Sequence, residues 1–104
     1  MTALDHLGFP ADAPAALRAR ALTFVDAPPA AAGALPAERL LDGGVRALEQ
    51  ALSAPPRDRT VALDVLTADA LVTRAMELFA ALPGDFEAEC ARCIGKLSVI
   101  RQLP

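Results

Sequence analysis

The sequence predicts a small all-α domain, an antiparallel bundle of three main helices with an additional N-terminal helix. Its 104 residues are enough for a single domain. They are 54% hydrophobic but only 4% aromatic, with neither Trp nor Tyr. Ala and Leu dominate the apolar content, and these residues favour helices over strands. Apolar residues also recur at helical spacing along most of the chain, which supports the same fold class.

The N-terminal region predicts a short helical turn, a break and then a first full helix over residues 13–25. Asp12 stands where an N-cap is expected. Pro14 follows in the first turn, where its missing N–H is not needed. Leu17, Ala21, Phe24 and Val25 share the apolar side of this helix.

Residues 26–36, DAPPAAAGALP, predict a linker between this helix and the rest of a single domain spanning 1–104. Adjacent prolines and a glycine favour an extended conformation. The segment is longer than most connections inside a helical bundle. Two placements of the N-terminal helix therefore remain open, against its own subunit or against a neighbouring one.

The second helix is expected over residues 37–53 and has the clearest apolar stripe. Gly43 and Gly44 lie in its middle, and two glycines cost roughly 2 kcal/mol relative to alanine there. Gly44 falls in the stripe and would let another helix come close, whereas Gly43 falls on the polar side, so the pair also predicts a bend. On the polar side, Asp42 and Arg46 are spaced for an ion pair. The stripe consists of Leu40, Leu41, Gly44, Val45, Leu48, Ala51 and Leu52.

The third helix is expected over residues 59–82, with Asp58 or Thr60 as its cap. Its apolar arc covers nearly half the circumference, which predicts a central position. Leu63 and Leu66 point elsewhere and suggest a second buried contact. The arc consists of Val61, Val65, Ala68, Leu71, Val72, Ala75, Met76, Leu78, Phe79 and Leu82.

Asp64 is the anomalous residue of this helix, because it projects at one side of the apolar arc. A carboxylate there needs a partner. We expect it to face an arginine from another helix or subunit. The alternative is a functional polar group in an apolar pocket.

The fourth helix is expected over residues 86–102, with Arg92 and Lys96 facing water. Cys90 and Cys93 form a CxxC motif inside its apolar stripe. Redox motifs place the first cysteine at a helix N-terminus after a strand, and a structural zinc site needs four ligands. Core cysteines are therefore the expected interpretation, with metal or redox chemistry as the alternative. The stripe consists of Phe86, Cys90, Cys93, Ile94, Leu97 and Ile100.

Residues 62–80, ALDVLTADALVTRAMELFA, resemble a helix of isoprenyl diphosphate synthases. The resemblance covers less than a fifth of the chain. The aspartate-rich motifs that bind magnesium and diphosphate in that family are absent from the sequence. The resemblance therefore implies no active-site residues here.

The charge pattern argues against several function classes. The net charge is −3 and the basic residues are scattered, so no basic stripe is available for nucleic acid. No segment predicts a signal peptide or a membrane span. We expect a cytoplasmic protein with reduced cysteines, without a cofactor, a metal, a nucleic-acid partner or a membrane partner.

Three functions remain open. The first is a non-catalytic interaction or assembly protein acting through apolar helix faces. We expect it to form a homodimer, because the chain has more apolar surface than a core of this size can bury. The second is a binder of a small apolar ligand between helices. The third is an enzyme of unknown type, which would need Asp64, His6, Asp69 or the cysteines in one cleft. The candidate interaction or ligand-pocket residues are Leu63, Asp64, Leu66, Met76, Phe79, Cys90 and Cys93.

Overall fold

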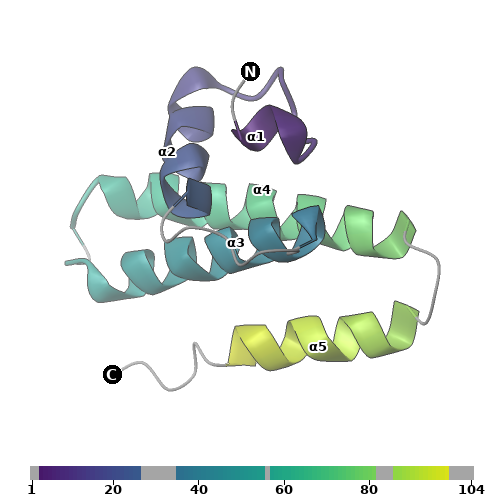
Figure 1. The fold of residues 1–104 in the computed structure, drawn as a ribbon. Helices are drawn as coiled ribbons and strands as arrows, with labels where there is room; N and C mark the ends of the chain where they lie inside the picture. Colours follow the sequence, from purple (N-terminus) through teal and green to yellow (C-terminus); the bar gives the residue numbers. More distant parts are fainter. Residues whose placement is uncertain (1–2, 27–34, 56, 82–85, 99–104) are drawn as a thin grey trace.

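The computed structural model describes residues 3–26, 35–55, 57–81 and 86–98, and within these ranges it contains helices and no strand. The predicted all-α class is thus confirmed (Figure 1). Residues 27–34 of the predicted linker and residues 99–102 of the predicted fourth helix lie outside the described ranges. The helices are α1 (Ala3–His6), α2 (Ala15–Asp26), α3 (Pro36–Ser53), α4 (Thr60–Ala81) and α5 (Phe86–Ser98).

The helix starts follow local backbone chemistry. The carbonyl of Pro14 accepts the N–H of Arg18 at 3.0 Å, so α2 begins at Ala15 and not at residue 13. Asp58 caps α4 as expected, because its Oδ1 accepts the backbone N–H of Thr60 at 2.9 Å and the hydroxyl at 2.8 Å. These two hydrogen bonds favour the ionised carboxylate and lower the pKa of Asp58.

The antiparallel pair α3–α4 forms the centre of the fold, and α2 crosses it (Figure 1). The core is completed from the N-terminal side by α1, α2 and the loop that joins them, which bury Leu4, Leu7, Phe9, Ala21 and Val25. The buried hydrophobic cluster consists of Leu4, Leu7, Phe9, Ala21, Val25, Ala37, Leu40, Leu41, Leu71, Ala75 and Phe79.

The two glycines of α3 are packing positions within one continuous helix. Both glycines are buried. A Cβ added at Gly44 would lie 2.7 Å from Cγ2 of Val72, and one added at Gly43 would lie 3.0 Å from Cγ2 of Val25. The assignment of Gly43 to a polar side was therefore wrong, because α3 contacts α4 and α2 on adjacent faces.

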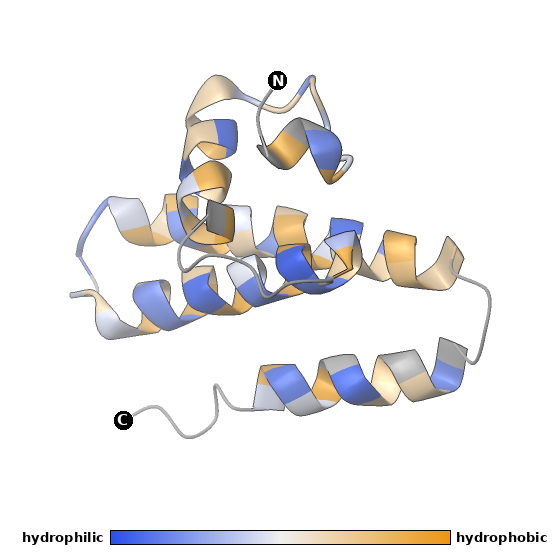
Figure 2. Cartoon of the chain, in the orientation of Figure 1, coloured by the Kyte–Doolittle hydropathy of each residue, from blue (hydrophilic) through white to orange (hydrophobic). Residues whose placement is uncertain are grey.

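The C-terminal helix α5 lies beside α3 and α4 but contributes little to the core (Figure 1). Ile94, expected in its buried stripe, is 67% exposed. Figure 2 shows hydrophobic and strongly hydrophilic residues alternating along α5. Among the described residues, α2 packs more closely on the α3–α4 pair than α5 does.

Ion pairs hold α5 to α3 and correct one expectation. Arg92 is exposed, as expected, and donates to Glu38 at 2.6 Å, while Lys96 donates to Asp42 at 2.9 Å. The first hydrogen bond lowers the pKa of Glu38. Asp42 therefore pairs with α5 and not with Arg46 as expected, and Arg46 donates instead to the carbonyl of Phe24 at 2.7 Å.

Candidate functional site

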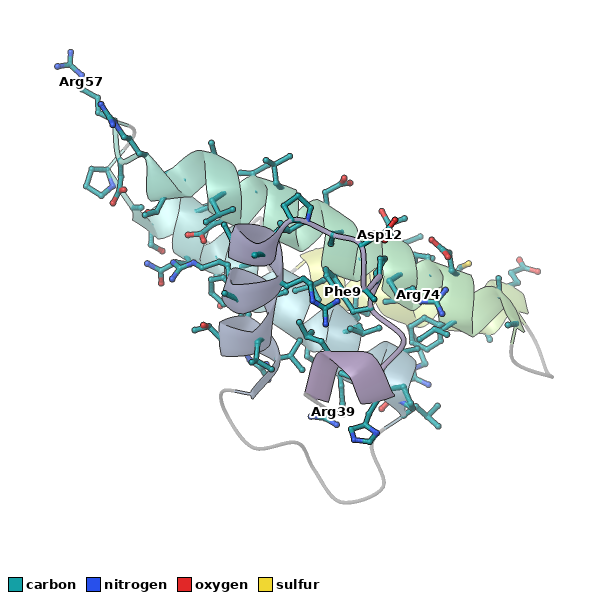
Figure 3. The ribbon with its side chains drawn as sticks, turned by 90° about the horizontal axis from the view of Figure 1, so that it is seen from above. Phe9, Asp12, Arg39, Arg57 and Arg74 are labelled. Carbon is teal, nitrogen blue, oxygen red and sulfur yellow. The ribbon has the colours of Figure 1, made fainter. Side chains whose placement is uncertain are left out.

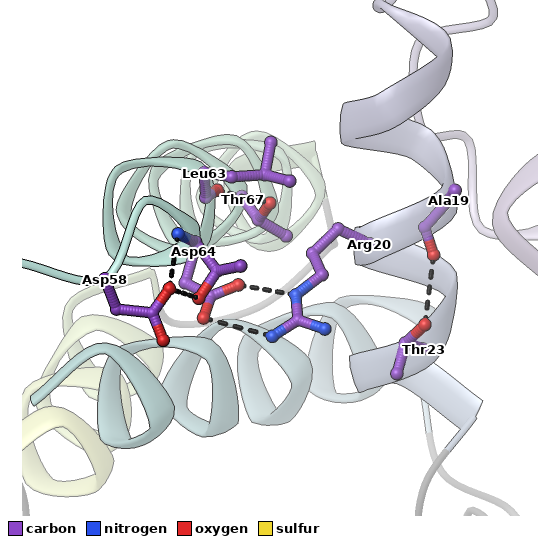
Figure 4. A network of polar contacts seen from close by, with 8 residues as sticks. Ala19, Arg20, Thr23, Asp58, Leu63, Asp64 and Thr67 are labelled. Atoms are coloured by element: carbon purple, nitrogen blue, oxygen red, sulfur yellow. Dashed lines mark hydrogen bonds and ion pairs between the residues drawn. The ribbon is translucent and has the colours of Figure 1, made fainter. Parts of the chain in front are cut away.

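Asp64 has the predicted kind of partner, an arginine from another helix of the same chain (Figure 4). Its side chain is completely buried, whereas that of Arg20 on α2 is 31% exposed. Arg20 Nε donates to Oδ1 at 2.6 Å, and Nη2 donates to Oδ2 at 3.2 Å. This two-point contact fixes the direction in which α2 crosses α4.

The surroundings of Arg20 favour the charged form of its guanidinium. The guanidinium of Arg20 lies 4.9 Å from the ring centroid of Phe24, within cation–π range. The hydrogen bonds from Arg20 to Asp64 raise the pKa of Arg20, against the effect of burial. The buried hydroxyl of Thr67 donates to the carbonyl of Leu63 at 2.7 Å. Both carboxylate oxygens are thus engaged and enclosed, and the arrangement serves as a structural clamp between α2 and α4.

The remaining predicted site residues occupy different environments. Phe79 belongs to the core at 2% exposure, whereas Leu66 is 60% exposed. Leu63, Met76 and Cys90 are half-buried, and Cys90 is a free thiol. The side chain of Cys93 lies outside the described part of the structure. The structure therefore does not place Leu66 with Phe79 in one enclosed site.

Hollows also lie elsewhere on the described surface. An apolar hollow of about 180 Å³, between the start of α3 and the end of α4, is smaller than typical ligand pockets. It is lined by Leu35, Pro36, Ala37, Leu78 and Ala81. A more polar hollow is lined by Gly8, Pro10, Asp69, Ala70, Thr73, Arg74 and Glu77.

The catalytic hypothesis gains no support from the positions of its candidate residues. Asp64 is enclosed by its arginine, while Asp69 on the same helix and His6 on α1 are exposed. Among the described residues, no three His, Cys, Asp or Glu side chains lie close enough together to hold a metal ion. Within the same ranges, no helix combines the length and apolar character needed to cross a bilayer.

An uncovered apolar surface lies where α3 ends and α4 begins, and we call it the hairpin-end patch. Leu52 is 56% exposed and Val65 46% exposed, although both were expected in buried stripes. The sequence showed that these residues were apolar, but it could not show that neither α2 nor α5 extends over them. The patch consists of Leu48, Leu52, Val61 and Val65, the first and third being half-buried.

Comparison with known proteins gives no match to this chain among protein families, curated proteins or solved structures.

Proposed function

We propose that this chain is a non-catalytic helical interaction or assembly protein that acts through apolar helix faces and associates with a second copy of itself. The observation that carries the proposal is the hairpin-end patch, where Leu52 and Val65 remain about half exposed beside a well-packed core. Scattered exposed apolar residues are normal on protein surfaces. Here, however, they adjoin on one face of the central helix pair, which is typical of an interface.

The clamp between Arg20 and Asp64 supports a structural role. It fixes α2 on the α3–α4 pair through a buried carboxylate whose two oxygens are both occupied. A rigid pair of helices presents its uncovered face in one defined shape, which lowers the entropy lost on association. The same proposal places the protein in the cytoplasm, where Cys90 would stay a free thiol.

Sedimentation equilibrium of the full chain at tens of micromolar tests this proposal. We expect a concentration-dependent mass that approaches twice the 10.8 kDa of one chain. Interference optics are needed, because the chain has no Trp or Tyr to absorb at 280 nm. A mass that stays at one chain throughout would overturn self-association.

A further inference from the structure

We infer that the second copy docks on the hairpin-end patch in an antiparallel, two-fold arrangement, with Arg57 and Arg59 of each chain facing Asp69 of the other. This inference rests on the self-association proposed above. It adds the contact surface of the dimer, the relative orientation of the two copies and the charged residues that favour this orientation.

The geometry of the helix pair places the apolar residues of the patch together. Gly44 on α3 contacts Val72 on α4, and the two helices run antiparallel. Leu52 lies about two helical turns after Gly44, and Val65 about two turns before Val72, so both are at nearly the same level. One heptad separates Val65 from Val72, so both lie on the same edge of α4.

The patch also faces away from the helix that covers the other side. Gly43 is the residue of α3 that approaches Val25 of α2. At 100° per residue, Leu52 points about 180° from Gly43. On α4, Asp64 is the residue that receives Arg20 of α2. The face that carries Leu52 is therefore opposite α2, on the side where α5 pairs with Glu38 and Asp42 of α3, and Leu52 lies ten residues beyond Asp42 along α3.

Unpaired charges of opposite sign lie at the two ends of this patch. Val61, Val65 and Asp69 are spaced four residues apart and follow one edge of α4. Asp69 is exposed one turn beyond Val65. Arg57 and Arg59 are exposed at the other end, on either side of the exposed carboxylate of Asp58, so that this end carries one net positive charge; Figure 3 shows Arg57 at the tip of the hairpin. Among the described residues, these three charged side chains have no hydrogen-bond or ion-pair partner.

This placement is self-complementary only in one orientation. Measured along α4 at 1.5 Å per residue, Asp69 is about 6 Å beyond Val65, and Arg59 is about 9 Å before it. A two-fold axis near Val65 would bring the acid of each copy to the arginines of the other. A parallel arrangement would place like charges together, which is unfavourable. A partner of uniform charge would match only one end, so the pattern favours a second copy of this chain.

Charge reversal tests the arrangement directly, using variants that change only exposed side chains. Asp69→Arg and the double change Arg57→Glu with Arg59→Glu should each weaken the dimer at least about tenfold, because like charges then meet across the axis. When these two variants are mixed in equal amounts, every facing pair is again of opposite sign. We expect the mixture to form a heterodimer of about the wild-type affinity.

Asp12→Arg is the matched control, since it makes the same reversal at an exposed site outside the patch. It should leave the dimer affinity unchanged, and circular dichroism should show equal helicity in all variants. A wild-type dimer that both reversals leave unaltered, or a mixture that stays monomeric, would overturn this arrangement while leaving self-association intact. A monomeric wild type would overturn both proposals.

Discussion

Two helices of nearly equal length, α2 with 12 residues and α5 with 13, attach to the same central pair in different ways. α2 buries Ala21 and Val25, and Val25 packs against Gly43 of α3. α5 leaves Ile94 exposed and reaches α3 through ion pairs on its surface. Apolar and polar residues are better separated on α5 than on α2, yet α2 packs more closely. How closely a helix packs on the central pair therefore depends more on small residues and a buried ion pair than on the separation of its apolar and polar residues.

The largest expected effect on stability comes from removing the Arg20–Asp64 ion pair that attaches α2 to α4. Arg20→Ala leaves the carboxylate of Asp64, which has no exposed surface, without a counter-charge. We expect the free energy of unfolding to fall by about 3 kcal/mol, because an uncompensated buried charge is strongly destabilising. Chemical denaturation at pH 7, followed by circular dichroism, measures this change.

Asp64→Ala is the paired control for the clamp. It leaves Arg20, whose side chain is 31% exposed, able to turn toward water. The expected loss is therefore smaller, about 1–2 kcal/mol. Equal losses for the two variants, or a negligible loss for Arg20→Ala, would contradict the idea that the buried charge determines how α2 is attached.

The sequence was sufficient to predict this clamp in outline but not its partner. Asp64 was recognisable because a carboxylate beside an apolar arc needs compensation. Nothing in local spacing distinguished Arg20 from the other arginines, since the pairing joins residues 44 positions apart. The same limitation explains why the exposure of Leu52 and Val65 could not be predicted from the sequence. Their periodicity predicts an apolar face, whereas the length and direction of neighbouring helices decide whether that face is covered.

Replacing a glycine by alanine should have opposite effects on stability at the α3–α4 contact and in α5. In Gly44→Ala the new Cβ would lie 2.7 Å from Val72, whose branched side chain has little freedom to move in a helix. Overpacking of this kind costs about 1–3 kcal/mol, which exceeds the gain of about 1 kcal/mol in helix propensity. We expect a net loss of stability, measured by thermal and chemical denaturation.

Gly95→Ala is the matched substitution in α5, where the added Cβ meets nothing within 4 Å. Only the propensity gain remains, so α5 should become more helical and its amides better protected from hydrogen exchange. If Gly44→Ala were also stabilising, the close approach of α3 and α4 would not depend on that glycine.

The smallest expected effect concerns the attachment of α5, which should depend on pH. The hydrogen bond from Arg92 lowers the pKa of Glu38 below its ordinary 4.5. A lowered acid pKa stabilises the folded contact above pH 4.5, and this contribution is lost as pH falls through the lower, folded value. Exposed pairs of this kind contribute about 0.5 kcal/mol. Hydrogen exchange should therefore show α5 amides losing protection below about pH 4.5, before those of α3 and α4.

Glu38→Gln should remove that pH dependence, whereas Glu77→Gln, which breaks a pair within α4 alone, should preserve it. A pH profile shared by α5 and α4 would mean that both helices unfold as one unit, and that these ion pairs do not control a separate attachment.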